Sequence, residues 1–214
     1  MDKKQLKKDY KKLKVEYRMA KRKALATVKN IEELLSTGPD RVVFDGTKSR
    51  MKKFKSVVEK CNRKNYENTP ADQPPEFNID TIRNHMQDVA GIRVITLYRS
   101  DIYRVFDAIK NTDLVITHID DYIKNPKDSG YRSLHIVVMV SIPTNDGTKL
   151  VPVEIQIRNK FMDVWATLDH ELRYKIDPDL VPNPEDVVKL QNMAITMDGL
   201  DDESEHIRFK KPAN

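Results

Sequence analysis

Two neighbouring apolar runs near the middle of the chain constrain its fold more than any other feature. Leu134–Val140 and Leu150–Ile157 are rich in β-branched residues, and each is short enough for a strand. The residues Asn145-Asp146-Gly147 between them are typical of a turn, so the runs predict an antiparallel hairpin. From residue 154 to residue 158 every second residue is polar, and such residues share one face of a strand. They are Glu154, Gln156 and Arg158. Because a carboxylate at the centre of a strong strand is costly to bury alone, that face is either a surface or the lining of a site.

The basic residues are concentrated at the start of the chain. Residues 1–29 hold 12 lysines and arginines against three carboxylates, a balance of +9, whereas the whole chain carries +5. Apolar residues recur there every three or four positions, which predicts a long helix with one buried stripe, ended by Gly38-Pro39. The cationic remainder is either a solvated face or an anion-binding surface for RNA or a regulatory polyphosphate nucleotide.

A second basic segment covers residues 49–60. Its apolar residues lie three and four apart, which predicts a helix that packs one side inward. Cations and a hydroxyl grouped near the start of a helix suit phosphate binding. The residues concerned are Arg50, Lys52, Ser56 and Lys60.

Helices and strands alternate through the middle of the chain. Asn78 is a suitable N-cap for a short helix through Met86. Residues 89–97, which include Arg93, predict a central strand. Ser100 is expected to cap a further helix, and residues 114–119 predict another strand before the hairpin.

The segment after the hairpin is predicted to be helical over residues 161–172 and 185–197, whereas the acidic run 198–205 is expected to be solvated and mobile. This order of elements predicts an α+β protein with a mixed sheet flanked by helices.

Composition excludes several classes of protein. The single cysteine, Cys61, rules out an intramolecular disulfide framework and fits a reducing compartment. No apolar run approaches a membrane span, and the N-terminus lacks the apolar core of a signal peptide. We therefore expect a soluble cytoplasmic protein with no membrane partner.

Three groups of motifs follow one another in the chain. They are DVAGIR at residues 88–93, DYI, PK and SGYRSLH within residues 121–135, and EIQIR at residues 154–158 with Trp165-Ala166 and His170. Together they resemble the synthetase domain of RelA/SpoT-type alarmone synthetases, and the short chain is similar to the small alarmone synthetases. The resemblance implies a nucleotidyltransferase-like fold. It also implies transfer of the ATP β,γ-pyrophosphoryl group to the 3′-hydroxyl of GDP or GTP, which yields ppGpp or pppGpp and AMP in the stringent response.

The resemblance assigns roles on the ATP side. Asp88 and Glu154 match acidic positions of the family, and two carboxylates that hold Mg²⁺ against the ATP phosphates suit phosphoryl-type transfer. Glu154 is also expected to accept the proton of the 3′-hydroxyl. Arg50 and Arg93 resemble the pair that sandwiches the adenine. The residues that match the segment gripping the ATP phosphates are Lys52, Ser56 and Lys60.

Roles on the acceptor side follow in the same way. Tyr131 resembles the tyrosine whose ring stacks on the acceptor guanine, although a loop tyrosine can also pack on a sheet edge. Lys127 and His135 match positions that contact the acceptor phosphates, while a hydrogen-bonded histidine at a strand start is the alternative for His135. Gln156 shares the face of Glu154 and is expected to orient the site.

Two features leave the acceptor open. Residues 118–121, HIDD, are nearer the acidic than the basic signature of long family members, which leaves metal use and the choice between GDP and GTP undecided. The strongly basic first helix supports an alternative, a toxin-type small alarmone synthetase that pyrophosphorylates the 3′ end of tRNA and blocks translation. A catalytically inactive RNA-binding module is a third hypothesis, against which the intact Asp88, Arg93, Tyr131 and Glu154 argue.

The expected organisation has three parts: a basic helix over residues 1–38, the synthetase domain over residues 39–176, and a C-terminal helix with a charged tail over residues 177–214. Small alarmone synthetases of this kind are often homotetramers. The apolar stripe of the first helix therefore either serves such an interface or packs within its own chain.

Overall fold

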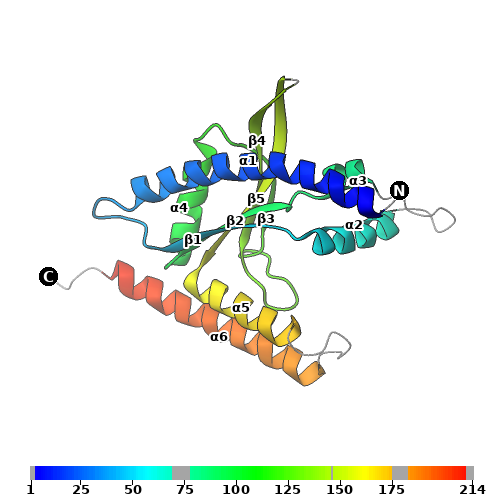
Figure 1. Ribbon diagram of the computed structural model, residues 1–214. Coiled ribbons are helices and arrows are strands. Elements are labelled where there is room, and N and C mark those ends of the chain that lie inside the picture. Colours follow the sequence, from blue (N-terminus) through cyan, green and yellow to red (C-terminus); the bar gives the residue numbers. More distant parts are fainter. Residues whose placement is uncertain (1–2, 69–77, 146, 175–182, 211–214) are drawn as a thin grey trace.

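A five-stranded mixed sheet organises the protein (Figure 1). The structure is a computed structural model and describes residues 3–68, 78–145, 147–174 and 183–210. The sheet has the order β1-β2-β5-β4-β3, in which β2 and β5 are parallel neighbours and the other pairs are antiparallel. The strands are β1 (Phe44–Met51), β2 (Ala90–Thr96), β3 (Val115–Asp121), β4 (Leu134–Thr144) and β5 (Gly147–Asn159). The predicted mixed sheet is confirmed.

The helices lie on both sides of this sheet. They are α1 (Lys3–Leu35), α2 (Phe54–Asn68), α3 (Ile79–His85), α4 (Arg99–Lys110), α5 (Lys160–Tyr174) and α6 (Pro184–Phe209). The apolar stripe of α1 is buried in one core with residues of α4 and the apolar face of β5, so the stripe packs within its own chain. Figure 1 shows α1 crossing the sheet, with α5 and α6 side by side beyond one end of the strands. None of the helices in the described segments is long and apolar enough to cross a membrane.

The predicted hairpin is confirmed. β4 pairs with β5 from Leu134↔Ile157 to Thr144↔Gly147, and Asp146 of the turn lies outside the described residues. Val151, Val153, Ile155 and Ile157 of β5 are buried, and each such burial stabilises the fold by about 1.5–3 kcal/mol. Glu154 and Gln156 are half-buried on the opposite face, away from α1 and α4.

The segment predicted as a helix from residue 49 begins as a strand. Arg50 lies on β1, opposite Gly91 of β2, and α2 starts only at Phe54. β1 occupies the sheet edge beside β2 and supplies backbone partners that β2 would otherwise lack there. Because no residue of β1 is buried, its sequence, FDGTKSRM, shows no apolar alternation that would indicate a strand.

Two expected helix caps have different outcomes. Asn78 caps α3 and forms a capping box with Thr81, as predicted. Ser100 is not the cap of α4, because Tyr98 occupies the N-cap position without a side-chain cap. The carboxylate of Glu205 instead accepts a hydrogen bond from the Ser100 backbone N–H at 2.7 Å, which satisfies one of the free donors of the first turn.

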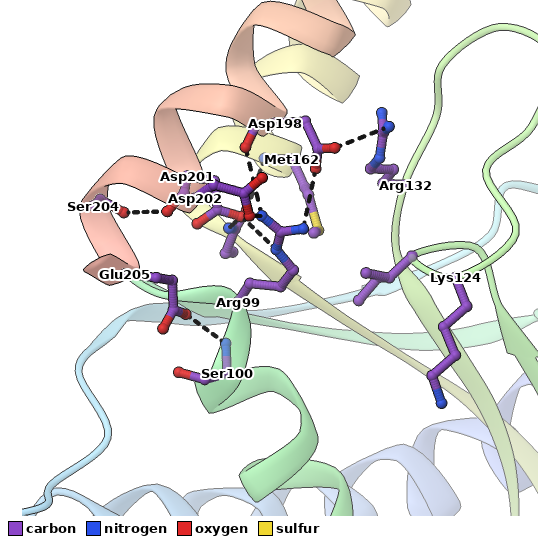
Figure 2. A network of polar contacts seen from close by, with 12 residues as sticks. Arg99, Ser100, Lys124, Arg132, Met162, Asp198, Asp201, Asp202, Ser204 and Glu205 are labelled. Atoms are coloured by element: carbon purple, nitrogen blue, oxygen red, sulfur yellow. Dashed lines mark hydrogen bonds and ion pairs between the residues drawn. The ribbon is translucent and has the colours of Figure 1, made fainter. Parts of the chain in front are cut away.

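The acidic run at residues 198–205 was expected to be mobile, and that prediction is wrong. The run is part of α6, which continues to Phe209. Figure 2 shows its aspartates around the guanidinium of Arg99 at the start of α4. Arg99 pairs with Asp198 at 3.4 Å, with Asp201 at 3.1 Å and with Asp202. Arg99, which is distant in sequence, pairs with three carboxylates of the run. A segment whose charges are typical of a solvated tail is therefore part of a docked helix.

Asp201 is the most buried carboxylate of this network. Burial raises the pKa of its carboxyl to about 6, against the opposing effects of Arg99 and of the Asn159 amide, which donates to Oδ2. Its other oxygen, Oδ1, is buried without a hydrogen-bond partner among the described residues. The ionised form therefore carries a desolvation cost that its partners only partly offset.

The raised pKa of the Asp201 carboxyl leads us to expect that stability falls as the pH rises from acidic values. The folded-state pKa lies above the ordinary value of 3.8, so the folded protein binds the extra proton and loses stability as the pH rises from about 4 to about 6. Over that interval we expect wild type to lose up to about 3 kcal/mol of unfolding free energy relative to Asp201→Asn. Urea unfolding of both proteins at about pH 4 and about pH 7 measures this change. A difference between the two proteins that does not vary with pH would contradict the prediction.

Candidate functional site

The polar face of the sheet carries two adjoining cavities. The smaller, of about 250 Å³, lies over β1, β2 and β5, and the larger, of about 630 Å³, extends from there to the loop before β4 and to α5. Arg50, Arg93 and Gln156 line both, so the two cavities share a wall, and together they are called the hollow. Glu154 lines the smaller cavity, whereas Lys127 and Tyr131 line the larger. The structure thus gathers predicted ATP-side and acceptor-side residues around one hollow.

Asp88 stands immediately before β2 and is held by two lysines. Lys52 Nζ and Lys60 Nζ lie 2.5 and 2.7 Å from its Oδ2 atom. Burial raises the pKa of the Asp88 carboxyl, but the two lysines outweigh burial and the net pKa is lowered. The Oδ1 atom is buried and has no hydrogen-bond partner among the described residues. Asp88 is therefore an ionised carboxylate with one free ligand atom.

Lys52 is fixed at this position by its backbone. Its N–H donates to the carbonyl of Val89 at 2.8 Å, and its carbonyl accepts from the Tyr10 hydroxyl of α1 at 2.9 Å. Lys60 follows on α2, and Ser56 lies one turn before Lys60, so both share a face of that helix. Two of the three residues expected to grip phosphates, Lys52 and Lys60, thus hold Asp88, and Ser56 shares the face of α2 that carries Lys60.

Glu154 lies on β5 beside Gly91 of β2. Its Oε1 atom is 3.3 Å from His135 Nδ1, and its Oε2 atom accepts from Gln156 Nε2 at 2.8 Å. Burial raises the pKa of the Glu154 carboxyl, and nearby Asp88 raises it as well. His135 and Gln156 lower the pKa by more than these two effects raise it, so the net pKa is lowered. Glu154 is consequently ionised at neutral pH.

A chain of hydrogen bonds connects Glu154 to Tyr131. The Tyr131 hydroxyl lies 2.7 Å from His135 Nε2 and accepts a hydrogen bond from Arg158 Nη2 at 2.5 Å. Because an ionised Glu154 can only accept, the imidazole proton lies on Nδ1, facing Glu154, and in the neutral imidazole Nε2 accepts from the Tyr131 hydroxyl. Both ring nitrogens of His135 are engaged, so His135 holds the tyrosine and the carboxylate in a fixed relation.

Asp163, which the sequence analysis did not single out, organises the arginines. Its Oδ1 atom lies 3.1 Å from Arg93 Nη1 and 3.5 Å from Arg158 Nη1. Burial lowers the pKa of Arg93, with further lowering by Arg158 and Arg50, and Asp163 opposes them. Asp163 lies in the first turn of α5, directly after β5, and no local spacing rule predicts that this turn meets Arg93 of β2.

Lys127 approaches two aromatic rings of the loop before β4. Its Nζ atom lies 4.4 Å from the ring centroid of Tyr122 and 5.5 Å from that of Tyr131. This places a cation beside the tyrosine expected to stack on the acceptor base.

No group of three or more His, Cys, Asp or Glu residues gathers as metal ligands in the described part of the chain. Mg²⁺ usually takes one or two protein carboxylates and completes its octahedron with water and substrate phosphates. The free Oδ1 atom of Asp88 and the ionised carboxylate of Glu154 fit that requirement.

Known proteins are similar to this chain in sequence and in structure. Residues 49–179 match the family described as "Region found in RelA / SpoT proteins". GTP pyrophosphokinase YjbM of Bacillus subtilis (strain 168) is 35% identical over 196 residues, which cover 91% of this chain and 86% of YjbM. GTP pyrophosphokinase YwaC of the same strain is 38% identical over 147 residues, which cover 68% of this chain and 66% of YwaC.

Solved structures agree with these relatives. Small alarmone synthetase 1 from Bacillus subtilis, bound to its product pppGpp, superimposes with a TM-score of 0.81 at 33% identity, covering 94% of this chain and 97% of that chain. A GTP pyrophosphokinase family protein from Streptococcus pneumoniae gives a TM-score of 0.78 at 29% identity, covering 94% and 93% of the two chains. The expected α+β, nucleotidyltransferase-like fold is thereby confirmed. Because the family match covers more than half of the chain and YjbM is similar along most of both sequences, this protein belongs to the RelA/SpoT family.

Proposed function

We propose that this protein is a (p)ppGpp synthetase, which transfers the pyrophosphoryl group of ATP to the 3′-hydroxyl of GDP or GTP and releases AMP. The observation that carries this proposal is one hollow with Glu154, Arg50 and Arg93 at one end and Tyr131 at the other. The second ionised carboxylate, Asp88, lies near enough to Glu154 to raise its pKa. The names of YjbM and YwaC as GTP pyrophosphokinases support it.

On the ATP side, the adenine lies between the guanidinium planes of Arg50 and Arg93, which line the same cavity. The phosphates lie against Lys52, Ser56 and Lys60, where Asp88 holds the two ammonium groups in position. Asp88 and Glu154 would hold Mg²⁺, which supplies neutralisation of the charge that develops on the phosphates.

On the acceptor side, the guanine of the nucleotide stacks on the ring of Tyr131. Lys127, which lies beside that ring, contacts the phosphates of the same nucleotide. Glu154 accepts the proton of the 3′-hydroxyl as that oxygen forms its bond to the β-phosphorus of ATP. The bond between the β-phosphorus and the α,β-bridging oxygen breaks, and AMP leaves with the bridging oxygen on its phosphate. The chain from Tyr131 through His135 to Glu154 connects the base-stacking residue to the proton acceptor.

The relatives favour a guanosine nucleotide over the 3′ end of tRNA as the acceptor. YjbM and YwaC are named for GTP, and the solved structure of small alarmone synthetase 1 contains pppGpp. The toxin-type alternative has no such support. The ionised carboxylates and ordered arginines likewise argue against an inactive RNA-binding module.

Transfer of label from γ-labelled ATP tests the function and the two carboxylates together. Wild type should label GDP or GTP, whereas Asp88→Asn and Glu154→Gln should each lose activity by about 100-fold or more, because each removes a charge that faces the phosphates. Circular dichroism and thermal unfolding serve as controls that both variants are folded.

Two outcomes of this assay contradict the proposal. Full activity of both folded variants would contradict the assignment of Asp88 and Glu154 to the active site. Label on deacylated tRNA but on no guanosine nucleotide would replace the proposed acceptor.

Tyr131 is expected to act on the acceptor more than on ATP. Tyr131→Ala should raise the acceptor KM by about tenfold, since stacking of a base on an aromatic ring is worth about 1–3 kcal/mol. Tyr131→Phe is the matched control, because it keeps the ring and removes only the hydroxyl bonded to His135 and Arg158. Steady-state kinetics with each substrate varied in turn measure the effect. Equal losses for ATP and acceptor in Tyr131→Ala would argue against stacking.

The exposed face of α1 supports an additional binding function. Its cations point away from the buried stripe and lie on a helix that packs on the face of the sheet opposite the site. The exposed residues include Lys7, Lys8, Lys11, Lys12, Arg18 and Arg22. We propose this face as an RNA-binding surface; the homotetramer expected from the family remains a prediction.

Charge reversal separates RNA binding from transfer. Replacing Lys7, Lys11, Arg18 and Arg22 by glutamate should weaken RNA binding and flatten its salt dependence, because fewer phosphate contacts release fewer counterions. GDP pyrophosphorylation should stay within about twofold of wild type, since these charges lie on the exposed side of α1 and are screened by salt. Filter binding at several salt concentrations provides the measurement. RNA affinity that is unchanged by the reversal would exclude this surface.

A further inference from the structure

We propose that α6 positions the acceptor loop, residues 124–132, and that Asp198 is the positioning residue that couples the helix to the loop. The inference rests on the proposed function, because its catalytic consequence depends on this loop presenting Tyr131 and Lys127 to the acceptor. Four observations lead to it.

The loop lies directly against α6 at a glycine. Gly130 has a φ of +87°, and a Cβ atom at this position would lie 2.6 Å from the Ala194 Cβ atom. Any other residue would therefore combine an unfavourable backbone conformation with a clash. Gln191 of the same helix donates from Nε2 to the Asp128 carbonyl at 2.5 Å, which adds a polar contact beside the close approach.

The ring of Tyr131 is supported from the same side. Trp165 of α5 is buried in a cluster with Leu190 and Ala194, and its ring contacts that of Tyr131 edge-on at 6.3 Å between centroids. The indole Nε1–H donates to the Leu190 carbonyl at 2.9 Å. The indole that backs Tyr131 is thus itself fixed by α6.

Asp198 ties the loop to the helix by charge. Its Oδ2 atom lies 3.2 Å from Arg132 Nη2, and its Oδ1 atom lies 3.4 Å from Arg99 Nη1. Figure 2 shows Asp198 between the two arginines, one on the loop and one at the start of α4. Arg132 follows Tyr131 in the chain and also donates to the Gly130 carbonyl at 3.4 Å, so the pair fixes the backbone that carries the tyrosine.

The helix is anchored independently of the loop. Arg99 binds Asp201 and Asp202, Glu205 accepts from the Ser100 N–H, and Arg208 pairs with Asp101 at 2.9 Å. All of these partners belong to the first turns of α4, whose apolar face is part of the main core. The C-terminal helix is therefore a rigid support that reaches the acceptor side of the hollow from outside it.

Kinetics of Asp198→Ala provide the first test. We expect the acceptor KM to rise about five- to tenfold, the equivalent of one typical hydrogen bond, with little change in the ATP KM or in kcat. Asp202→Ala is the matched control, because Asp202 pairs with Arg99 from the same helix but is largely exposed. Asp198→Glu should recover part of the loss, because it restores the charge.

Hydrogen exchange provides a readout that does not need catalysis. Amides of residues 124–132 should exchange faster in Asp198→Ala than in wild type or Asp202→Ala, because the loop loses its anchor. Ala194→Leu should do the same by placing bulk against Gly130, without altering any charge.

The outcomes separate the two proposals. If Asp198→Ala matches Asp202→Ala in loop exchange and in acceptor KM, or if both substrates' KM values rise equally, the positioning role is wrong. If wild type transfers no label to GDP or GTP, the proposed function fails, and the exchange data alone decide whether α6 holds the loop.

Discussion

The parallel pairing of β2 with β5 is the constraint on which the rest of the site depends. It sets Gly91 beside Glu154 and Arg93 beside Gln156, two strand positions that are 63 residues apart in the chain. Parallel neighbours need a long crossover, and here α4, β3, the acceptor loop and β4 fill it. The same crossover delivers Tyr131 and His135 to the edge of the hollow, so one topological requirement brings the ATP side and the acceptor side together.

Oppositely charged and hydrogen-bonding partners within the site offset the desolvation of its buried carboxylates. Each carboxylate has its own partners: two lysines for Asp88, His135 and Gln156 for Glu154, and two arginines for Asp163. Burial alone would raise the pKa of Asp88 and Glu154, and only these partners keep both groups ionised. A preorganised arrangement of this kind suits phosphoryl-type chemistry, in which positioning and electrostatic stabilisation supply most of the catalysis.

Two long helices support the site from opposite sides. α1 buries its apolar stripe on the core face of the sheet and reaches Lys52 through the Tyr10 hydroxyl. α6 docks on α4 through its acidic run and on α5 through Leu190 and Ala194, which pack on Trp165, and it contacts the loop around Gly130. Elements outside the central motifs therefore hold residues on both sides of the hollow.

The sequence alone was sufficient for the hairpin, the Asn78-capped helix and the mixed sheet, and it singled out several of the residues that line the hollow, among them Arg93, Tyr131 and Glu154. Alternation, capping chemistry and family motifs are local signals, and these features depend on local signals. It did not reveal β1, because an exposed edge strand needs no apolar alternation, and it misjudged residues 198–205, because their charges look solvated until Arg99 is placed among them. The roles of Asp163 and Asp198 likewise became evident only from the tertiary structure. Their partners, Arg93 and Arg132, lie 66 or more positions away along the chain, and no local pattern encodes which distant charge an acidic residue will meet.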